Sequence, residues 1–408
     1  MARTEAFIID ALRTPVGKYG GVLRDVRPDD LSALVISKLI ERIHLDPKLV
    51  QDVMWGCANQ AGEDNRNVGR MATLLAGLPY SVPANTINRL CGSSLDAINQ
   101  AARAIWSEDL DIVIAGGVES MSRAPYSVPK NQSGNYGNVT AFDTALGWRY
   151  PNPQLQKMFP LESMGETAEN VAEKYKISRE EQDQFALASH QKAIKAQKNN
   201  IFASEIVPVE LPHRKGDPIV VKDDEGPRAD TSIEKLSKLS PVFRKTGSVT
   251  AGNSSSMNDG AAAVLVVSEK KMKELNLKPM ARIVSTGIAG VDPRFMGIGP
   301  VPATEIALQK ANLTMNHIDL IELNEAFAAQ SLAVIRDLHI PMEKLNVNGG
   351  AIALGHPLGC SGARIMTTLL HEMKRGSTSL ATGQKARYGV ATMCIGVGQG
   401  IATIVEAP

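Results

Sequence analysis

The sequence predicts an α/β fold made of two similar halves, with a polar segment inserted into the first. The first 121 residues and the stretch from Ala281 onward both alternate strand-like runs with amphipathic helical patterns. Such alternation is typical of layered α/β domains and favours a largely parallel sheet. Residues 122–247 are rich in Pro, Asn, Gly and charged residues and have patchy periodicity, which indicates a functional insertion.

The first half is expected to contain four short strands and three helices. Acidic residues Asp29 and Asp30 suit the start of the first helix, because the positive end of a helix dipole attracts negative charge. Apolar residues at helical spacing mark the last helix, which begins near Ser93. The expected strands are 6–9, 52–58, 86–88 and 112–115, and the expected helices are 31–43, 67–75 and the one from Ser93.

One helix stands out within the insertion, and a group of cations follows it. The helix begins at Ser178, where Glu181 three residues later completes a capping box. Cationic residues then gather in the second half of the insertion, and a solvated loop surface is the favoured interpretation of each one taken singly. The cations are His213, Arg214, Lys215, Arg228, Lys235, Lys238, Arg244 and Lys245.

The last part of the chain repeats the order of elements seen in the first. Here too a strand precedes a helix, as the strand ending near Cys57 does in the first half. A later helix is led by a Gly-Cys pair, as the helix after Cys91 is led by a Cys-Gly pair. A duplicated α/β domain explains this order. The expected strands are 320–323, 346–348, 389–395 and 401–406, and the expected helices are 325–338 and 361–374.

Composition excludes several classes of protein. The chain of 408 residues is 43% hydrophobic with a net charge of +1, so bulk charge indicates neither a nucleic acid nor an anionic membrane as partner. Its apolar runs are shorter than a membrane span, and its first residues lack the pattern of a signal peptide. The four cysteines are widely separated and form no metal-type or redox-type pair. A cytoplasmic protein without a metal site is therefore expected.

Cys91 is the first candidate for chemistry, because it lies where a strand-like run meets a helical pattern. Unpaired N–H groups and the helix dipole at such a position favour an anion and lower the pKa of a cysteine. Gly92 allows close approach of backbone or substrate. A small buried packing residue is the alternative, and this stretch alone leaves both interpretations open.

Three glycine-rich patches and one strand end add further candidates. A histidine within a glycine-rich loop, His356, is well placed to move a proton. Cys394 precedes a second glycine-rich turn. Asn324 follows the strand 320–323, at the edge where open α/β sheets bind ligands. The three patches are 348–362, 393–400 and 250–260, and none has the spacing of a nucleotide-binding loop.

These motifs, in this order, closely resemble the thiolase family, and the resemblance covers essentially the whole chain. Its most specific markers are Asn324-Glu-Ala-Phe327, Gly355-His-Pro357 and Cys394-Ile-Gly-Val-Gly398, together with Asn-Arg-Leu-Cys91-Gly-Ser. The resemblance implies a five-layered αβαβα fold made of two similar halves with an inserted loop domain. Residues 1–121 with 248–272 would form the N-terminal half, 122–247 the loop domain and 279–408 the C-terminal half.

The resemblance also implies cleavage of a 3-oxoacyl-CoA by CoA, or the reverse condensation. Cys91 would form a covalent acyl-enzyme, and His356 would activate its thiol and stabilise oxyanion charge. Cys394 would protonate the departing acetyl-CoA carbanion and later deprotonate the second CoA. A water held by Asn324 would join His356 in one oxyanion hole, and the N–H groups of Cys91 and Gly396 would form the other. Cys57 and Cys360 match no catalytic position and are interpreted as packing residues.

For binding, the family pattern implies a set of contacts to CoA, which acts as a co-substrate and not as a tightly bound cofactor. Arg228 would lie near the adenine or phosphates and Ser255 near the pantetheine. No metal is implied, and family members are homodimers or homotetramers. The residues expected to line the tunnel are Met164, Phe243, Ala251 and Phe327.

Two departures from the family pattern bear on the substrate. Ser163-Met164 replaces the His-Met of biosynthetic acetoacetyl-CoA thiolases, which favours a degradative role. Ser94 and Ser256 stand where glycine is usual and are expected to narrow the pocket or alter backbone angles.

Three stretches look especially like β-ketoadipyl-CoA thiolases of aromatic-compound degradation, namely 56–67, 142–149 and 299–304. We therefore expect a substrate with a distal carboxylate, met by Arg149 or another loop-domain cation, since arginine suits bidentate carboxylate binding. A general fatty-acid 3-ketoacyl-CoA thiolase of β-oxidation or an acetoacetyl-CoA thiolase is the alternative.

Other classes fit less well. A condensing ketosynthase usually carries histidine where Cys394 stands. A non-catalytic lipid carrier is expected to lack one of Cys91, His356 and Cys394, and this chain has all three. A cysteine protease needs no second cysteine and does not explain the motif at Asn324.

Overall fold

One mixed sheet of ten strands runs through the molecule, a computed structural model that describes residues 3–130, 138–213, 216–376 and 385–408. In the first half, β1 (Ala6–Arg13) pairs antiparallel with β10 (Asn258–Ser268), and β10 pairs antiparallel with β5 (Ile112–Ser120). The next neighbour, β3 (Asp52–Gly56), is parallel to β5, and β4 (Ala84–Ile87) is parallel to β3 at the edge.

The second half repeats this pattern of directions. The strand β11 (Ala281–Gly290) pairs antiparallel with β14 (Gln399–Glu406), and β14 pairs antiparallel with β13 (Tyr388–Ile395). The strand β12 (Leu320–Leu323) is parallel to β13. Each half thus has two antiparallel pairs followed by parallel pairing, with two parallel pairs in the first half and one in the second, which confirms that the two halves are alike. They join where β1 pairs with β11.

The expectation of a largely parallel sheet is wrong, and the connections explain why. Parallel neighbours need a crossover, usually through a helix, whereas β14 follows β13 through a short turn and must therefore run antiparallel to it. The strand β10 lies at the corresponding place in the first half and enters the sheet only after the long insertion.

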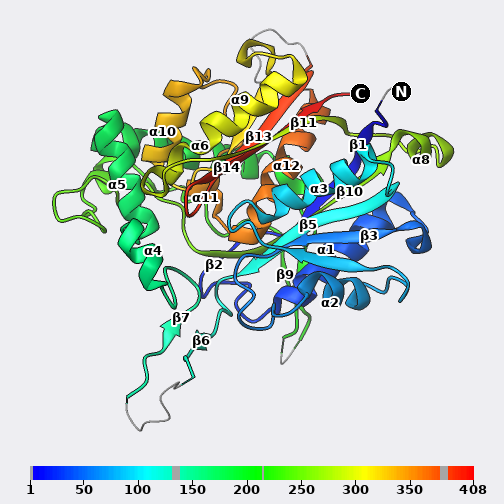
Figure 1. Ribbon diagram of the computed structural model, residues 1–408, viewed down its shortest axis with the longest axis horizontal. Helices are drawn as coiled ribbons and strands as arrows, with labels where there is room; N and C mark the ends of the chain where they lie inside the picture. The colour runs from blue at the N-terminus through cyan, green and yellow to red at the C-terminus, as the bar shows by residue number, and fades with distance from the viewer. Residues whose placement is uncertain (1–2, 131–137, 214–215, 377–384) are drawn as a thin grey trace.

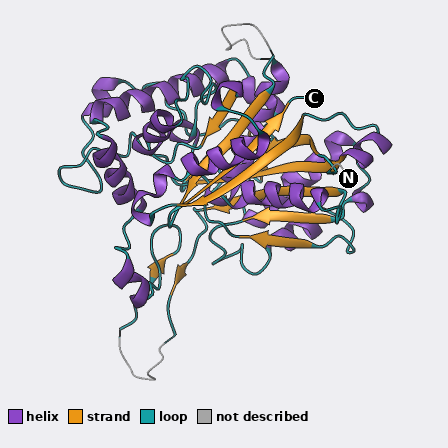
Figure 2. Ribbon diagram, turned by 45° about the horizontal axis from the view of Figure 1, so that its top comes forward, coloured by secondary structure: helices purple, strands orange, loops and turns teal. Residues whose placement is uncertain are grey.

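The helices form three layers around the strands, which confirms the αβαβα order (Figure 1). At the centre, α3 (Ser93–Trp106) and α12 (Leu358–Arg375) contact each other and strands of both halves. The outer face of the first half is covered by α1 (Pro28–Ile43) and α2 (Val68–Leu75), and that of the second half by α9 (Pro300–Ala311). Colouring by secondary structure shows the strands running between these helical layers (Figure 2).

The two central helices approach so closely that glycine is required between them. A Cβ atom at Gly362 of α12 would lie 2.4 Å from the backbone nitrogen of Leu95 in α3. At the same contact the hydroxyl of Ser94 accepts a hydrogen bond from the Ala363 N–H, 2.9 Å away. Because α3 follows Cys91 and α12 follows His356, this contact fixes the two candidate segments relative to each other.

The insertion begins after β5 and returns to the sheet at β10. Its helix α6 (Arg179–Lys198) has the predicted capping box, in which Ser178 and Glu181 bond each other's backbone N–H groups. Buried Arg13 of β1 anchors the insertion, because its guanidinium bonds the carboxylates of Glu205 and Asp224. The other elements of the insertion are α4 (Pro153–Met158), α5 (Met164–Tyr175), α7 (Ile233–Ser237) and strands β6 (Tyr126–Ser127), β7 (Phe142–Asp143), β8 (Val209–Leu211) and β9 (Ile219–Val221).

Most predicted elements of the two halves are present, with shifted ends. The predicted strand at 346–348 is wrong: Asn346 has a positive φ of 41°, and its side chain bonds the backbone of Leu323. The strands β10 and β11, which lie on either side of β1, were not predicted. The remaining elements are β2 (Gly17–Lys18), α8 (Glu269–Glu274), α10 (Ala328–Asp337) and α11 (Ala351–Leu354). Within the described ranges, every helix is too short or too polar to cross a membrane.

Replacing Gly362 by alanine is expected to destabilise the protein by about 2 kcal/mol, because the new methyl group overpacks the contact between α3 and α12. Gly260→Ala is the matched control, since a Cβ there meets its nearest atom only at 3.4 Å. Urea denaturation of both variants measures the difference. Equal stability of the two would contradict a tight helix contact.

Candidate active site

Cys91 lies immediately before the start of α3, as the sequence predicts. Gly92 is the N-cap residue, and a Cβ there would lie 2.6 Å from the Ile395 side chain, so glycine is needed for β13 to approach. The backbone N–H groups of Gly396 and Cys91 lie near the sulfur and favour its thiolate form, which lowers the pKa of the thiol. Burial nevertheless raises the pKa of the Cys91 thiol to about 11. The expectation of a lowered pKa is therefore wrong, because loss of water outweighs the N–H groups.

The turn between β13 and β14 brings Gly396 to Cys91. Ile395 pairs with Gln399, so residues 396–398 form a three-residue connection at the tip of the hairpin. Side-chain atoms of Leu90 and Met164 both lie 3.4 Å from the place where a Cβ of Gly396 would be. Gly396 therefore lies between the cysteine loop and the first residue of α5, with its N–H near the Cys91 sulfur.

Cys394, the second candidate thiol, is buried in β13 two residues before Gly396. It packs in an apolar cluster with Met296, Phe327 and neighbouring residues. Burial raises the pKa of the Cys394 thiol, and the nearby Cys91 raises it further because two thiolates would repel each other. Cys394 therefore carries its proton at neutral pH and is able to donate it.

His356 is held in one tautomer by the first turn of α12. The hydroxyl of Ser361 donates to the Pro357 carbonyl at 2.8 Å, so its oxygen accepts from His356 Nδ1, 2.6 Å away. The ring is thus protonated at Nδ1, and Nε2 has a free lone pair. Burial, together with Arg364, lowers the pKa of His356 to about 3, which keeps the ring neutral. The backbone N–H of His356 donates to Asn258, which fixes the loop.

Asn324 lies against the histidine ring, with its Nδ2 3.4 Å from His356 Nε2. Its own backbone N–H donates to the Thr392 carbonyl, which ties the end of β12 to β13 near Cys394. Its Oδ1 is buried and has no hydrogen-bond partner among the residues that the structure describes. A buried amide oxygen without a partner is costly, so this atom is a suitable place for a bound water.

Taken together, these groups can perform nucleophilic catalysis on a carbonyl. Two thiols, one neutral imidazole and two inward N–H groups lie at the ends of strands and helices from both halves. Such a set supplies a nucleophile, a proton acceptor, a proton donor and donors for an oxyanion.

The chain matches two family descriptions over nearly its full length: "Thiolase, N-terminal domain" at residues 6–270 and "Thiolase, C-terminal domain" at residues 277–407. The chain belongs to the thiolase family. Its curated relatives include the beta-ketoadipyl-CoA thiolase of Acinetobacter baylyi, which is 54% identical over 98% of this chain and 99% of the relative. The 3-oxoadipyl-CoA/3-oxo-5,6-dehydrosuberyl-CoA thiolase of Escherichia coli (strain K12) is 55% identical with the same coverage.

Solved structures of thiolases have the same fold. The human mitochondrial 3-ketoacyl-CoA thiolase in complex with CoA has a TM-score of 0.91 and 42% identity, and the match covers 99% of this chain and 98% of that one. The Bacillus anthracis acetyl-CoA acetyltransferase also has a TM-score of 0.91, with 43% identity and complete coverage of both chains. These likenesses confirm the predicted fold class.

The structure brings several of the predicted tunnel residues together in this thiolase. The rings of Phe243 and Phe327 meet edge to face with centroids 6.4 Å apart. The Ser255 N–H donates to the Ala326 carbonyl, beside Phe327. Met164 packs against the apolar cluster that contains Phe327 and Cys394. Ala251 is exposed on the same loop as Ser255.

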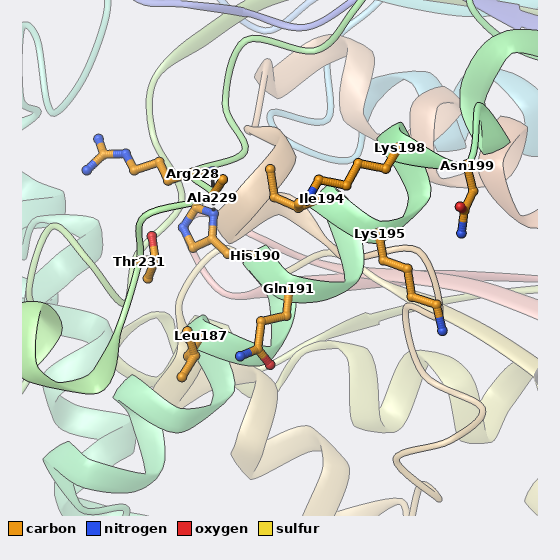
Figure 3. A pocket seen from close by; sticks show the side chains of 10 residues that line it. All are labelled: Leu187, His190, Gln191, Ile194, Lys195, Lys198, Asn199, Arg228, Ala229 and Thr231. Atoms are coloured by element: carbon orange, nitrogen blue, oxygen red, sulfur yellow. Dashed lines mark hydrogen bonds between the residues drawn. The ribbon is translucent and has the colours of Figure 1, made fainter.

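Arg228 lies apart from this group, at a cavity of about 370 Å³ next to α6 (Figure 3). Its backbone N–H donates to His190 Nδ1 at 3.2 Å, while its guanidinium points away from that ring. Lys195 and Lys198 of α6 also line the cavity. The side chain of Arg228 is exposed, so it is free to meet a ligand at the surface of the insertion.

Arg149, expected to meet a substrate carboxylate, instead braces its own loop. Its guanidinium donates to the backbone carbonyls of Thr144 and Asn59, at 2.9 and 3.1 Å.

The two serines expected to narrow the pocket or alter backbone angles, Ser94 and Ser256, instead make hydrogen bonds that hold neighbouring segments. Ser94 is buried between α3 and α12, and the Ser256 hydroxyl bonds Asn258, the residue that holds the His356 backbone.

Sequence reasoning missed three residues that hold the site in place: Ser361, Asn258 and Glu119. The buried Glu119 carboxylate accepts N–H bonds from Ala58, Asn59 and Gly359, and so joins the end of β3 to the first turn of α12. Burial raises the pKa of Glu119 to about 7. The sequence signal for Glu119 was its place just after the double glycine of β5, at the end of a strand.

The raised pKa of Cys91 predicts how the free enzyme reacts with iodoacetamide. Only the thiolate reacts, so the rate of alkylation should rise about tenfold per pH unit between about pH 7 and about pH 10. The reaction is quenched at set times, and the alkylated Cys91 peptide is quantified by mass spectrometry. The variant Cys91→Ala is the control for alkylation of the other cysteines. A plateau near neutral pH would instead indicate a thiolate already paired with an imidazolium.

Proposed function

We propose that this thiolase cleaves 3-oxoadipyl-CoA with CoA and so produces acetyl-CoA and succinyl-CoA. The observation that carries the proposal is the 54–55% identity, over nearly the whole chain, to relatives named for this substrate. The presence of both thiols and the histidine of the family motifs, with Cys394 and His356 buried and Cys91 partly buried, supports it. A general 3-ketoacyl-CoA thiolase is the second candidate, since a solved relative at 42% identity has that name.

The first half-reaction begins with attack of Cys91 sulfur on the 3-oxo carbon. The thiol proton passes to His356 Nε2, which the bond from Nδ1 to Ser361 leaves unprotonated. Negative charge develops on the former 3-oxo oxygen and needs positioned donors. A water on the unpaired Oδ1 of Asn324, together with His356, supplies them.

Cleavage of the bond between carbons 2 and 3 then leaves an acyl group on Cys91 and the enolate of acetyl-CoA. The N–H groups of Cys91 and Gly396 stabilise the enolate oxygen. Cys394 protonates carbon 2, which its raised pKa and its position beside Cys91 favour. Acetyl-CoA leaves, and the Cys394 thiolate takes the proton of a second CoA, whose sulfur attacks the acyl-enzyme. The released Cys91 thiolate then takes back the proton held by His356 Nε2.

CoA would bind along the insertion. The tunnel formed by Met164, Phe243 and Phe327 suits the pantetheine arm, which ends at the thiols, with Ser255 and Ala251 along it. Arg228 would meet the phosphates or adenine near the surface. The proposed binding partners are therefore acyl-CoA and CoA. We also propose that the enzyme works in the cytoplasm. Its proposed assembly is a homodimer or homotetramer.

The substrate is tested by measuring kcat/KM for CoA-dependent thiolysis of 3-oxoadipyl-CoA and 3-oxooctanoyl-CoA. We expect a preference for the dicarboxylate of roughly tenfold or more, because a site built for a polar group rejects an apolar analogue. Preference for 3-oxooctanoyl-CoA would support the general thiolase instead. Activity on neither substrate would reject the proposed function.

Ser361→Ala tests the tautomer of His356. Without the serine oxygen, Nδ1 loses its acceptor and the ring is free to protonate at Nε2, so kcat should fall roughly 10- to 100-fold, in the range of general-base effects. Ser204→Ala removes a similar bond, 3.1 Å long, to the distant His371, and is the matched control. The test is to measure kcat of both variants by steady-state kinetics. Equal kcat values for the two would contradict the role of Ser361.

A further inference from the structure

The turn that carries Gly396 contains a valine in an unfavourable conformation. Val397 has φ = 63° and Gly398 has φ = 81°. Two successive positive φ angles in a tight turn favour glycine and asparagine over a residue with a bulky Cβ. Among the described non-glycine residues with positive φ, Val397 is the one with a β-branched side chain. Such a backbone costs on the order of 1–3 kcal/mol and persists at functional sites.

The surroundings hold the turn in this conformation. The Gly398 carbonyl accepts a hydrogen bond from the Val291 N–H at 2.8 Å, and a Cβ at Gly398 would lie 2.3 Å from the Val291 carbonyl oxygen. On the other side, the Gly396 N–H lies near the Cys91 sulfur. The turn around Val397 therefore has close neighbours at both ends.

Packing within the chain does not explain why this side chain is a valine. Val397 is 40% exposed, and it lines a small, mostly apolar cavity of about 50 Å³ together with neighbouring residues. Met164 belongs both to this cavity and to the surroundings of Gly396, and Val397 follows Gly396 directly, so the cavity lies beside the turn that carries Gly396. Glu162 is the one titratable side chain in the lining, and its Oε2 accepts a bond from Asn170. The full lining is Trp148, Leu155, Phe159, Pro160, Leu161, Glu162, Met164, Thr167, Pro293 and Val397.

We propose that Val397 is a specificity-determining residue that limits the length of the acyl group carried on Cys91. Its two methyl groups narrow the cavity beside this turn, so a succinyl or acetyl group fits and a longer chain meets the valine. The backbone strain is kept because glycine, which would relieve it, would not supply this wall. The inference rests on the proposed thiolase activity and adds to it a residue that selects the substrate.

Three variants separate the side chain from the backbone strain. Val397→Gly removes the wall and the strain, whereas Val397→Ala removes most of the wall and leaves a residue with Cβ at positive φ. Val397→Asn relieves the strain but keeps a branched side chain of similar size. Val22→Gly is the matched control, because Val22 is 39% exposed and lies on a surface turn remote from Cys91.

The quantity to measure is the ratio of kcat/KM for 3-oxodecanoyl-CoA to kcat/KM for acetoacetyl-CoA. It should rise about tenfold or more in Val397→Gly and Val397→Ala, since each methylene rejected by a pocket is worth at least that factor. It should stay within about twofold of wild type in Val397→Asn and Val22→Gly. Thermal unfolding should show Val397→Gly and Val397→Asn at or above the wild-type Tm, and Val22→Gly below it.

Two failures are distinguishable. Unchanged ratios in both Val397→Gly and Val397→Ala, with normal turnover of acetoacetyl-CoA, would overturn the role of Val397 and leave the thiolase activity standing. Wild-type protein that cleaves neither of these substrates nor 3-oxoadipyl-CoA would reject the proposed function, and the role of Val397 with it.

Discussion

The close contact between α3 and α12 is the constraint on which the active site depends. The nucleophile precedes one helix and the histidine precedes the other, so the spacing of the helices sets the spacing of the two segments. Glycine at 362 and the Ser94 hydroxyl allow and fix that spacing. The outer layers of helices and strands then bury this contact from both sides, which explains why the functional groups lie at the centre of the molecule.

Burial at the centre has an electrostatic consequence for every titratable group there. Charged forms are disfavoured without water, so Cys91 and Cys394 hold their protons and the His356 ring stays neutral, with a proton on Nδ1 alone. The resting site is therefore neutral, and charge appears only when a substrate carbonyl is present. Donors already in place, such as the Gly396 N–H, then need little rearrangement to stabilise that charge.

The sequence located the chemistry better than it described the surroundings. Local patterns were enough to place Cys91 before a helix and His356 in a glycine-rich loop, and the duplicated order of strands and helices was visible without coordinates. The pKa of Cys91 was not predictable, because it depends on burial by β13, more than 300 positions away in the chain. Arg149 was misjudged for a similar reason, since one of its acceptors is the carbonyl of Asn59. The strand β10 was missed because its glycine- and serine-rich approach resembles a loop.

The two halves are alike, but one pair of corresponding strands is connected very differently in each half. The strands β13 and β14 are joined by Gly396, Val397 and Gly398, whereas the corresponding strands β5 and β10 are joined by everything between Ser120 and Asn258. One hairpin tip is thus a compact turn beside Cys91, and its counterpart is the whole insertion. Under the proposed function, the short connection would serve the chemistry and the long one would serve substrate binding, so a change in one connection need not disturb the other.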